Sequence, residues 1–203
     1  MSVLGTHSTD IAGERVDLPI LAIDEQRAIV LLNVLDHGVR FNERVGRALA
    51  EAMAPHRPQV VLGTATLGIP VAIETSRALG LDTYVIAQKS PKVYLADPVA
   101  VPLRSSTTAG TQRLYIDRRA VPLLEGKRVA VVDDVAATGE SLAASLALAR
   151  EAGGQVVSIG VVLTEGNGWK KRLGDDADLV IRLGHIPQYA IRGGSLALMA
   201  ESI

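Results

Sequence analysis

The stretch that decides the fold is Ala130-Val131-Val132-Asp133-Asp134-Val135-Ala136-Ala137-Thr138-Gly139-Glu140-Ser141. Its apolar start ends abruptly in two carboxylates, and a turn of small and hydroxyl residues then leads into an alanine- and leucine-rich helical pattern. In open α/β sheets, a turn between a strand and the next helix lies in the ligand-binding crevice. Free backbone N–H groups at the start of such a helix suit a phosphate, and carboxylates accept hydrogen bonds from hydroxyls. Together these features indicate a site for a phosphorylated pentose.

A plainer interpretation of the same residues is available. Asp133 and Asp134 could simply end a strand, with Thr138 or Ser141 capping the helix that follows. In the ligand interpretation, the two acids accept hydrogen bonds from ribose hydroxyls, while the backbone of residues 136–139 and the two hydroxyl side chains hold the phosphate.

Composition limits the class of protein. The chain has 203 residues, of which 48% are hydrophobic, enough for one domain with a sizeable core. Lys plus Arg total 21 against 22 Asp plus Glu, so there is no basic excess for binding nucleic acid. The absence of cysteine excludes disulfides and thiolate metal sites. Neither a secretory signal near residue 1 nor a membrane-spanning run is visible, since apolar runs such as residues 28–32 are far too short. We therefore expect a cytoplasmic protein with neither nucleic-acid nor membrane partners.

Strand and helix patterns alternate along the chain. Residues 1–13 are predicted to be a loose arm, and residues 18–34 have no clear assignment. Strands are predicted at residues 59–62, 83–87, 99–103, 113–116, 127–132, 155–163 and 179–182, and helices at 42–53, 70–79 and 141–152. This alternation predicts a single α/β domain with a parallel sheet flanked by helices on both faces.

A second strand-turn-helix segment covers residues 60–70. Taken alone it is an ordinary connection of an α/β core, but beside the acidic turn it could hold a second anion. A ligand that carries both a 5-phosphate and a diphosphate needs two such sites. Lys89, just after the strand at 83–87, could add a cation there, or could be a solvated lysine at a strand end.

The acidic stretch resembles the signature of type I phosphoribosyltransferases: hydrophobic residues, two acids, small residues, Thr-Gly and a hydroxyl residue. The resemblance covers about residues 32–183 and is strongest to the purine branch, which includes adenine and xanthine phosphoribosyltransferases and related purine repressors. It implies one domain with a core at about residues 40–183 and a small hood over the base site from residues 18–37 and 184–203. It also implies that 5-phosphoribosyl 1-diphosphate (PRPP) binds to Asp133, Asp134, Val135, Ala136, Ala137, Thr138, Gly139, Glu140 and Ser141.

The resemblance implies further ligands. The diphosphate would be bound by Thr64, Ala65, Thr66, Leu67, Gly68 and Lys89. Mg2+ would contact Asp133 and Asp134 mainly through water, because magnesium keeps several waters and needs few protein ligands. A homodimer is expected by the same analogy.

The predicted catalytic residues are Asp133, Asp134, Arg104 and Arg113. The polar stretch at residues 104–111 is expected to close over the diphosphate. It contains no lysine, although xanthine enzymes tend to carry one, so Arg104 or Arg113 would have to supply the cation for the leaving group. The turn at residues 64–68 also lacks the acid or arginine of many adenine enzymes, and Gln88 stands where an arginine is common.

Three residues are candidates for contacting the base. Asn167 and Trp169 follow the strand at 155–163, where the family places its base-contacting segment. Trp169 could stack on a purine or cover the edge of the core. Asn167 could bond a purine edge or serve the turn. Asp36 lies near a polar base contact of xanthine enzymes, or is only an acid at the start of a helix. His185 is more typical of a structural turn.

The resemblance implies an enzyme that transfers the 5-phosphoribosyl group from PRPP to a purine base and releases diphosphate, in purine salvage. The departures described above keep one alternative open, a catalytically weak or inactive PRPP-binding sensor or regulator. A receiver-type signalling domain also carries paired acids, but near its amino terminus and without the Thr-Gly-hydroxyl turn.

Overall fold

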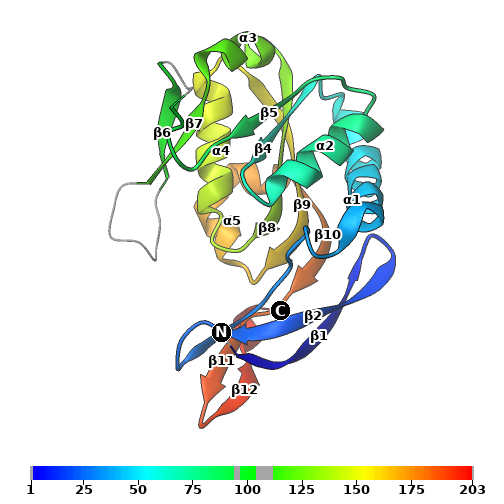
Figure 1. Ribbon diagram of the computed structural model, residues 1–203, viewed down its shortest axis with the longest axis vertical. Coiled ribbons are helices and arrows are strands. Elements are labelled where there is room, and N and C mark those ends of the chain that lie inside the picture. Colours follow the sequence, from blue (N-terminus) through cyan, green and yellow to red (C-terminus); the bar gives the residue numbers. More distant parts are fainter. Residues whose placement is uncertain (1, 94–96, 104–111, 203) are drawn as a thin grey trace.

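The main sheet of the computed structural model, which describes residues 2–93, 97–103 and 112–202, is parallel throughout (Figure 1). Its strands, in spatial order, are β10 (Val180–Ile186), β9 (Gln155–Glu165), β8 (Arg128–Ala136), β4 (Val60–Thr64) and β5 (Tyr84–Ala87). The predicted parallel sheet is confirmed. Strand β8 runs past its predicted end at residue 132, because Asp133 and Val135 still pair with Val161 and Leu163 of β9.

Helices cover both faces of this sheet (Figure 1). α1 (Gly38–Met53) and α2 (Gly68–Ala78) lie on one face, and α4 (Glu140–Glu151) and α5 (Gly168–Leu173) on the other. α1 buries Phe41, Val45, Leu49 and Met53, which recur every four residues on one side of the helix. The remaining helical elements are short: η1 (Ala54–His56), η2 (Arg118–Ala120), α3 (Val121–Leu124), η3 (Gly174–Leu179) and η4 (Ala200–Ser202).

The sheet divides the core into two layers. Successive residues of β8 alternate between them: Val129 and Val131 pack toward α4, whereas Ala130 and Val132 pack toward α1 and α2. Because both faces are buried, the strand is apolar at every position from Val129 to Val132, rather than at every second one. Among the described helices, none is both long and apolar enough to cross a bilayer.

A separate hairpin, β6 (Val99–Leu103) and β7 (Gln112–Ile116), packs beside α4. Its two strands are antiparallel, and Gln88 bridges to Tyr115 and so ties the hairpin to the end of β5. Both strands lie where the sequence predicted them. The intervening residues 104–111 lie outside the described part of the chain, and with them the predicted closing segment and Arg104.

The hood is an antiparallel sheet built from both chain ends, at the bottom of Figure 1. Its order is β1 (Val3–Ile11), β2 (Glu14–Ala22), β3 (Arg27–Val30), β11 (Tyr189–Arg192) and β12 (Ser195–Leu198). The prediction of a loose arm at residues 1–13 is therefore wrong, and the hood begins at Val3 rather than at residue 18. Its carboxyl-terminal part also begins later than predicted, because residues 184–186 belong to β10 of the main sheet.

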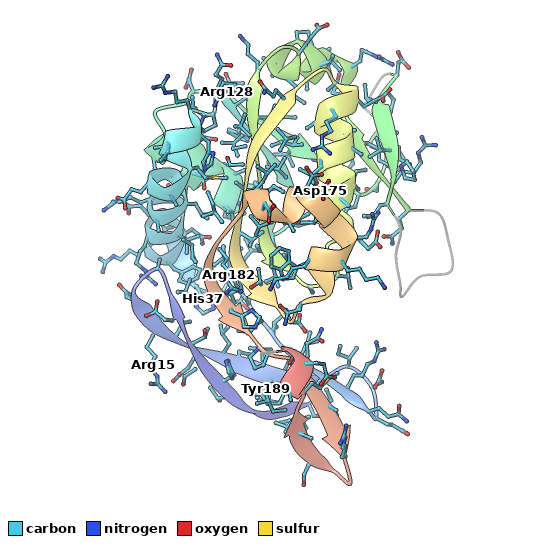
Figure 2. The ribbon with its side chains drawn as sticks, turned by 180° about the vertical axis from the view of Figure 1, so that it is seen from behind. Arg15, His37, Arg128, Asp175, Arg182 and Tyr189 are labelled. Atoms are coloured by element: carbon cyan, nitrogen blue, oxygen red, sulfur yellow. The ribbon has the colours of Figure 1, made fainter. Side chains whose placement is uncertain are left out.

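Hydrogen bonds tie the hood to the main sheet. The Thr9 hydroxyl of β1 donates to the His185 carbonyl at 2.9 Å. The His185 ring lies 2.8 Å from the Thr164 hydroxyl through Nδ1 and 2.9 Å from the Ser202 carbonyl through Nε2. In Figure 2, Arg182 marks this junction and Tyr189 the start of β11. His185 thus has the structural role that its sequence context favours.

Candidate active site

A cavity of about 310 Å³ lies between the carboxyl end of the main sheet and the hood. This is the edge at which open parallel sheets bind ligands. Its sheet side is formed by Ala65, Thr66, Leu67, Lys89, Asp133, Asp134, Val135, Ala137, Ser141 and Glu165, and its hood side by Ile29, Val30, Leu31 and Leu32. The cavity therefore combines a polar, charged half with a mostly apolar half.

The acid pair lies within β8, at the base of this cavity. Asp133 is only 5% exposed, and Asp134 is half-buried. Burial and the neighbouring Asp134 charge raise the pKa of Asp133 well above its ordinary value, while the Lys89 ammonium lowers it in part. Burial likewise raises the pKa of Asp134. Burial makes the charged form of both carboxyls unfavourable. Ligand hydroxyls or a cation would stabilise that charged form, so the pair is suited to bind either of them.

The turn after β8 encloses a second cavity of about 150 Å³, lined by residues 135–142. Gly139 has a φ of +79°, and a Cβ on it would lie 3.0 Å from the Trp169 Cα, so only glycine fits at this position. The Glu140 carboxylate is paired with Arg172 at 2.8 Å. This pairing partly compensates the negative charge of Glu140 at the start of α4. The N–H groups there can therefore still suit a phosphate.

The turn after β4 lies against the acid pair. Gly68 is the contact point, since a Cβ at this residue would lie 2.9 Å from Asp133 Oδ1. Thr64 lies behind the turn, with its hydroxyl 2.9 Å from the Ser145 hydroxyl of α4. Ser145 in turn donates to the Ser141 carbonyl at 2.9 Å. The two predicted anion-binding turns are thus joined by a buried hydrogen-bonded link, and Thr64 serves that link rather than the cavity.

Lys89 is brought to the same place by β5. It lines the cavity and is close enough to the acid pair to lower the pKa of both Asp133 and Asp134. Its ammonium would lie beside any anion held by residues 65–67. The structure therefore places the predicted cation beside the predicted diphosphate turn.

Arg113, predicted to be catalytic, does not reach this cavity. Along β7 its neighbours Leu114 and Ile116 alternate inward, and Arg113 points to the exposed side. Its guanidinium donates to the Ala100 carbonyl at 3.0 Å and lines a different hollow, bounded also by Arg118.

The three predicted base contacts also lie outside the cavity lining. Trp169 is 4% exposed and packs in the core beneath Gly139, with its indole N–H donating to the Gly166 carbonyl at 3.1 Å. Asn167 donates to the Glu201 carbonyl. The carboxylate of Asp36 accepts from the Asn33 amide at 2.7 Å in an exposed loop. Trp169 thus packs in the core, as its alternative interpretation has it, whereas Asn167 and Asp36 make hydrogen bonds that neither of their interpretations described.

The cavity lining also contains residues that the sequence interpretation missed. The segment 29–32, from the end of β3 into the connection toward α1, supplies an apolar wall. Glu165, the last residue of β9, is 9% exposed, and burial raises its pKa. An acid at the carboxyl end of an apolar strand is the same signal that identified Asp133, and it could have identified Glu165.

The oxygen donors at the site fit magnesium that is held largely by ligand and water. Within the described residues, no three His, Cys, Asp or Glu side chains gather into a metal cage. Asp133 and Asp134 provide carboxylate oxygens beside the space for an anionic ligand. Magnesium commonly binds through one or two carboxylates together with phosphate oxygens and waters.

Comparisons with known proteins agree with this architecture. A phosphoribosyl transferase domain model matches residues 33–186. The chain is 30% identical over 156 residues to a xanthine phosphoribosyltransferase of Brevibacillus brevis, covering 73% of this chain and 78% of that protein. It is also 30% identical over 141 residues to an orotate phosphoribosyltransferase of Desulforamulus reducens, covering 70% of this chain and 61% of that protein.

Solved structures show the same fold. A crystal structure of adenine phosphoribosyltransferase from Thermoanaerobacter pseudethanolicus superposes with a TM-score of 0.65 and 26% identity, covering 78% of this chain and 88% of that one. The family model alone spans most of the chain, including both predicted anion-binding turns and the acid pair. The chain belongs to the type I phosphoribosyltransferase family.

Proposed function

We propose that this protein transfers the 5-phosphoribosyl group from PRPP to a purine base and releases diphosphate. One observation carries the proposal: a single cavity joins two strand-to-helix turns, an acid pair and a lysine to an apolar wall of the hood. PRPP has a phosphate, a diphosphate and ribose hydroxyls, and each has a chemically matching surface here. The apolar wall at residues 29–32 suits a flat heterocyclic ring.

The proposed pose follows from the lining. The 5-phosphate would occupy the turn at residues 135–141, and the ribose hydroxyls would donate to Asp133 and Asp134. The diphosphate would lie on residues 65–68 beside Lys89. The base would lie between the hood and the end of β9.

The reaction requires no nucleophile from the protein. A purine nitrogen forms the bond to the anomeric carbon as the bond to diphosphate breaks, and positive charge develops on the ribose. The protein aligns the two reactants, stabilises the charges that develop and keeps water out. Magnesium bound with the diphosphate would neutralise part of its charge. Arg104 remains the predicted additional cation on the protein.

The purine assignment is supported by the apolar hood wall and by similarity to xanthine and adenine enzymes. By the family analogy, the proposal includes a role in purine salvage, a cytoplasmic location and a homodimer. Sedimentation analysis of the purified chain would test the last of these.

The decisive experiment incubates the protein with PRPP, Mg2+ and, separately, adenine, guanine, hypoxanthine, xanthine and orotate. Nucleotide formation and diphosphate release are measured together. Purine-dependent release of both products is the expected result. Tight PRPP binding by calorimetry, without product from any base, would reject the transferase and leave the PRPP-binding sensor.

A further inference from the structure

Within the part of the chain that the structure describes, Glu165 is the one acidic side chain besides Asp133 and Asp134 that lines the cavity. We propose that the Glu165 carboxylate selects the base, by accepting hydrogen bonds from N–H groups on the edge of an uncharged purine and by repelling anionic bases such as orotate. This inference rests on the proposed function and specifies its substrate class. It assigns Glu165 to base selection rather than to the bond-breaking step.

The position of Glu165 in the sheet separates it from the sugar-binding acids. Asp133 of β8 pairs with Val161 of β9, and Glu165 lies four residues farther toward the hood. Four residues of extended strand span about 13 Å. That separation puts Glu165 well away from Asp133 along the sheet, so the two acids would contact different parts of a ligand in the cavity.

The carboxyl is held by rigid neighbours. Glu165 pairs in register with Ile186, which is fully buried. Gln188 hydrogen-bonds its side chain, and the Gln188 backbone N–H is itself held by the Ser202 hydroxyl at 2.8 Å. The next residue, Gly166, has a φ of +54°, and a Cβ there would lie 3.0 Å from Gln188 Cδ. Gln188 is therefore packed closely against the main chain directly after Glu165.

A carboxylate has about four acceptor sites, so the hydrogen bond from Gln188 leaves capacity for a ligand. Burial outweighs that bond and raises the pKa of Glu165. Residues 29–32 opposite supply apolar side chains. Buried polar groups need partners, and the N–H groups of a purine edge would provide them.

The same carboxylate distinguishes between the bases used by the relatives. Adenine, guanine, hypoxanthine and xanthine all offer N–H donors on the ring edge. Orotate carries its own carboxylate, and two like charges in a water-poor cavity repel strongly. The chain is similar to both orotate and xanthine enzymes, so similarity alone leaves this choice open.

The test uses Glu165→Gln, with Glu165→Asp as a graded variant and the exposed Glu51→Gln on α1 as a matched control. Rates of diphosphate release are measured for the five bases at saturating PRPP and Mg2+. Calorimetry measures PRPP affinity, and thermal melting confirms folding. We expect kcat/KM for the preferred purine to fall about 10- to 100-fold in Glu165→Gln. PRPP affinity should stay within about twofold, the orotate-to-purine ratio should rise, and Glu165→Asp should be intermediate.

A folded Glu165→Gln variant with an unchanged base preference would overturn the assignment. If the unaltered protein releases no diphosphate with any base, the proposed transfer fails. Purine binding to the PRPP-loaded protein then tests Glu165 separately. Equal affinity in the unaltered protein and in Glu165→Gln, or no purine binding at all, would overturn the assignment, whereas weaker binding by the variant would support it.

Discussion

At the sugar-phosphate end of the cavity, each wall is a continuous piece of chain in which a parallel strand passes through a short turn into a helix. Strand β8 leads into α4, and β4 leads into α2. At the proposed base end, the wall combines residues 29–32 with Glu165, which come from two distant parts of the chain. The first end is specified by local sequence and the second by the docking of the hood. We expect changes at the two ends to affect different ligands.

The largest effect should come from Asp134→Asn at the sugar-phosphate end. It removes an ionised acceptor for a ribose hydroxyl, and each such charge-assisted bond contributes about 1.5–3 kcal/mol. PRPP affinity should fall at least about tenfold and turnover by orders of magnitude, as measured by calorimetry and diphosphate release. Asp175→Asn, an exposed acid of η3, is the control. Unchanged PRPP affinity in both Asp133→Asn and Asp134→Asn would reject the sugar site.

A smaller effect at the same end is expected from Gly68→Ala. The added Cβ would lie 2.9 Å from Asp133 Oδ1, so the carboxylate must shift. We expect PRPP affinity to weaken about tenfold, a loss of about 1.4 kcal/mol, with little change in melting temperature. Gly5→Ala in the hood is the matched control, because its Cβ would meet its nearest neighbour at an ordinary 3.7 Å. Equal PRPP affinity in the two variants would contradict the close approach of the two anion-binding turns.

At the proposed base end, His185→Phe should weaken base binding without weakening PRPP binding. It removes the ring contacts to Thr164 and Ser202 that hold the carboxyl-terminal turn against the sheet. We expect a loss of about 1–2 kcal/mol in the free energy of unfolding, measured by denaturant titration, and a higher KM for the base. PRPP affinity should be unchanged. A PRPP affinity that falls as much as base affinity would mean that the two ends are not independent.

The local character of the sugar-phosphate end explains why it was predictable. Asp133, Gly139 and their neighbours lie within one short stretch, so spacing alone placed them on a strand end and a turn. The parallel sheet followed for the same reason, from apolar runs that are buried on both faces. The carboxyl ends of β8, β9 and β10 were all underestimated. In β8 two carboxylates looked like the end of a strand, although Asp133 still pairs with β9.

The strands of the hood could not be predicted from local sequence in this way. Strand β1 turns into β2 through Ala12 and Gly13, both with positive φ, and Ala-Gly is a much weaker hairpin signal than Asn-Gly. The alternating burial of β1 is also shallow. Trp169 kept two interpretations for a related reason, since an aromatic after a strand suits either a ligand or a core. Its contact with Gly139 depends on the packing of α5 against the turn after β8, which the local sequence does not specify.

The smallest effect should come from a residue outside both ends. Asp117 precedes η2, where its carboxylate accepts from the Arg119 N–H at 2.8 Å and pairs with the Arg119 side chain at 2.6 Å. These hydrogen bonds from Arg119 lower the pKa of Asp117 to about 2. Because the folded-state pKa is depressed, the stabilisation is complete above the unfolded value of about 4 and is lost as the pH falls toward about 2.

Asp117→Asn should therefore lower the melting temperature slightly at neutral pH, and the difference from the unaltered protein should shrink below about pH 4. Thermal melting across this range measures the effect, with Asp175→Asn again as the control. PRPP affinity and base KM at neutral pH should both stay unchanged, since Asp117 lines neither half of the cavity. A change in PRPP affinity or in the KM for the base would show that ligand binding responds to a general loss of stability. The different responses expected of variants at the two ends of the cavity would then need another explanation.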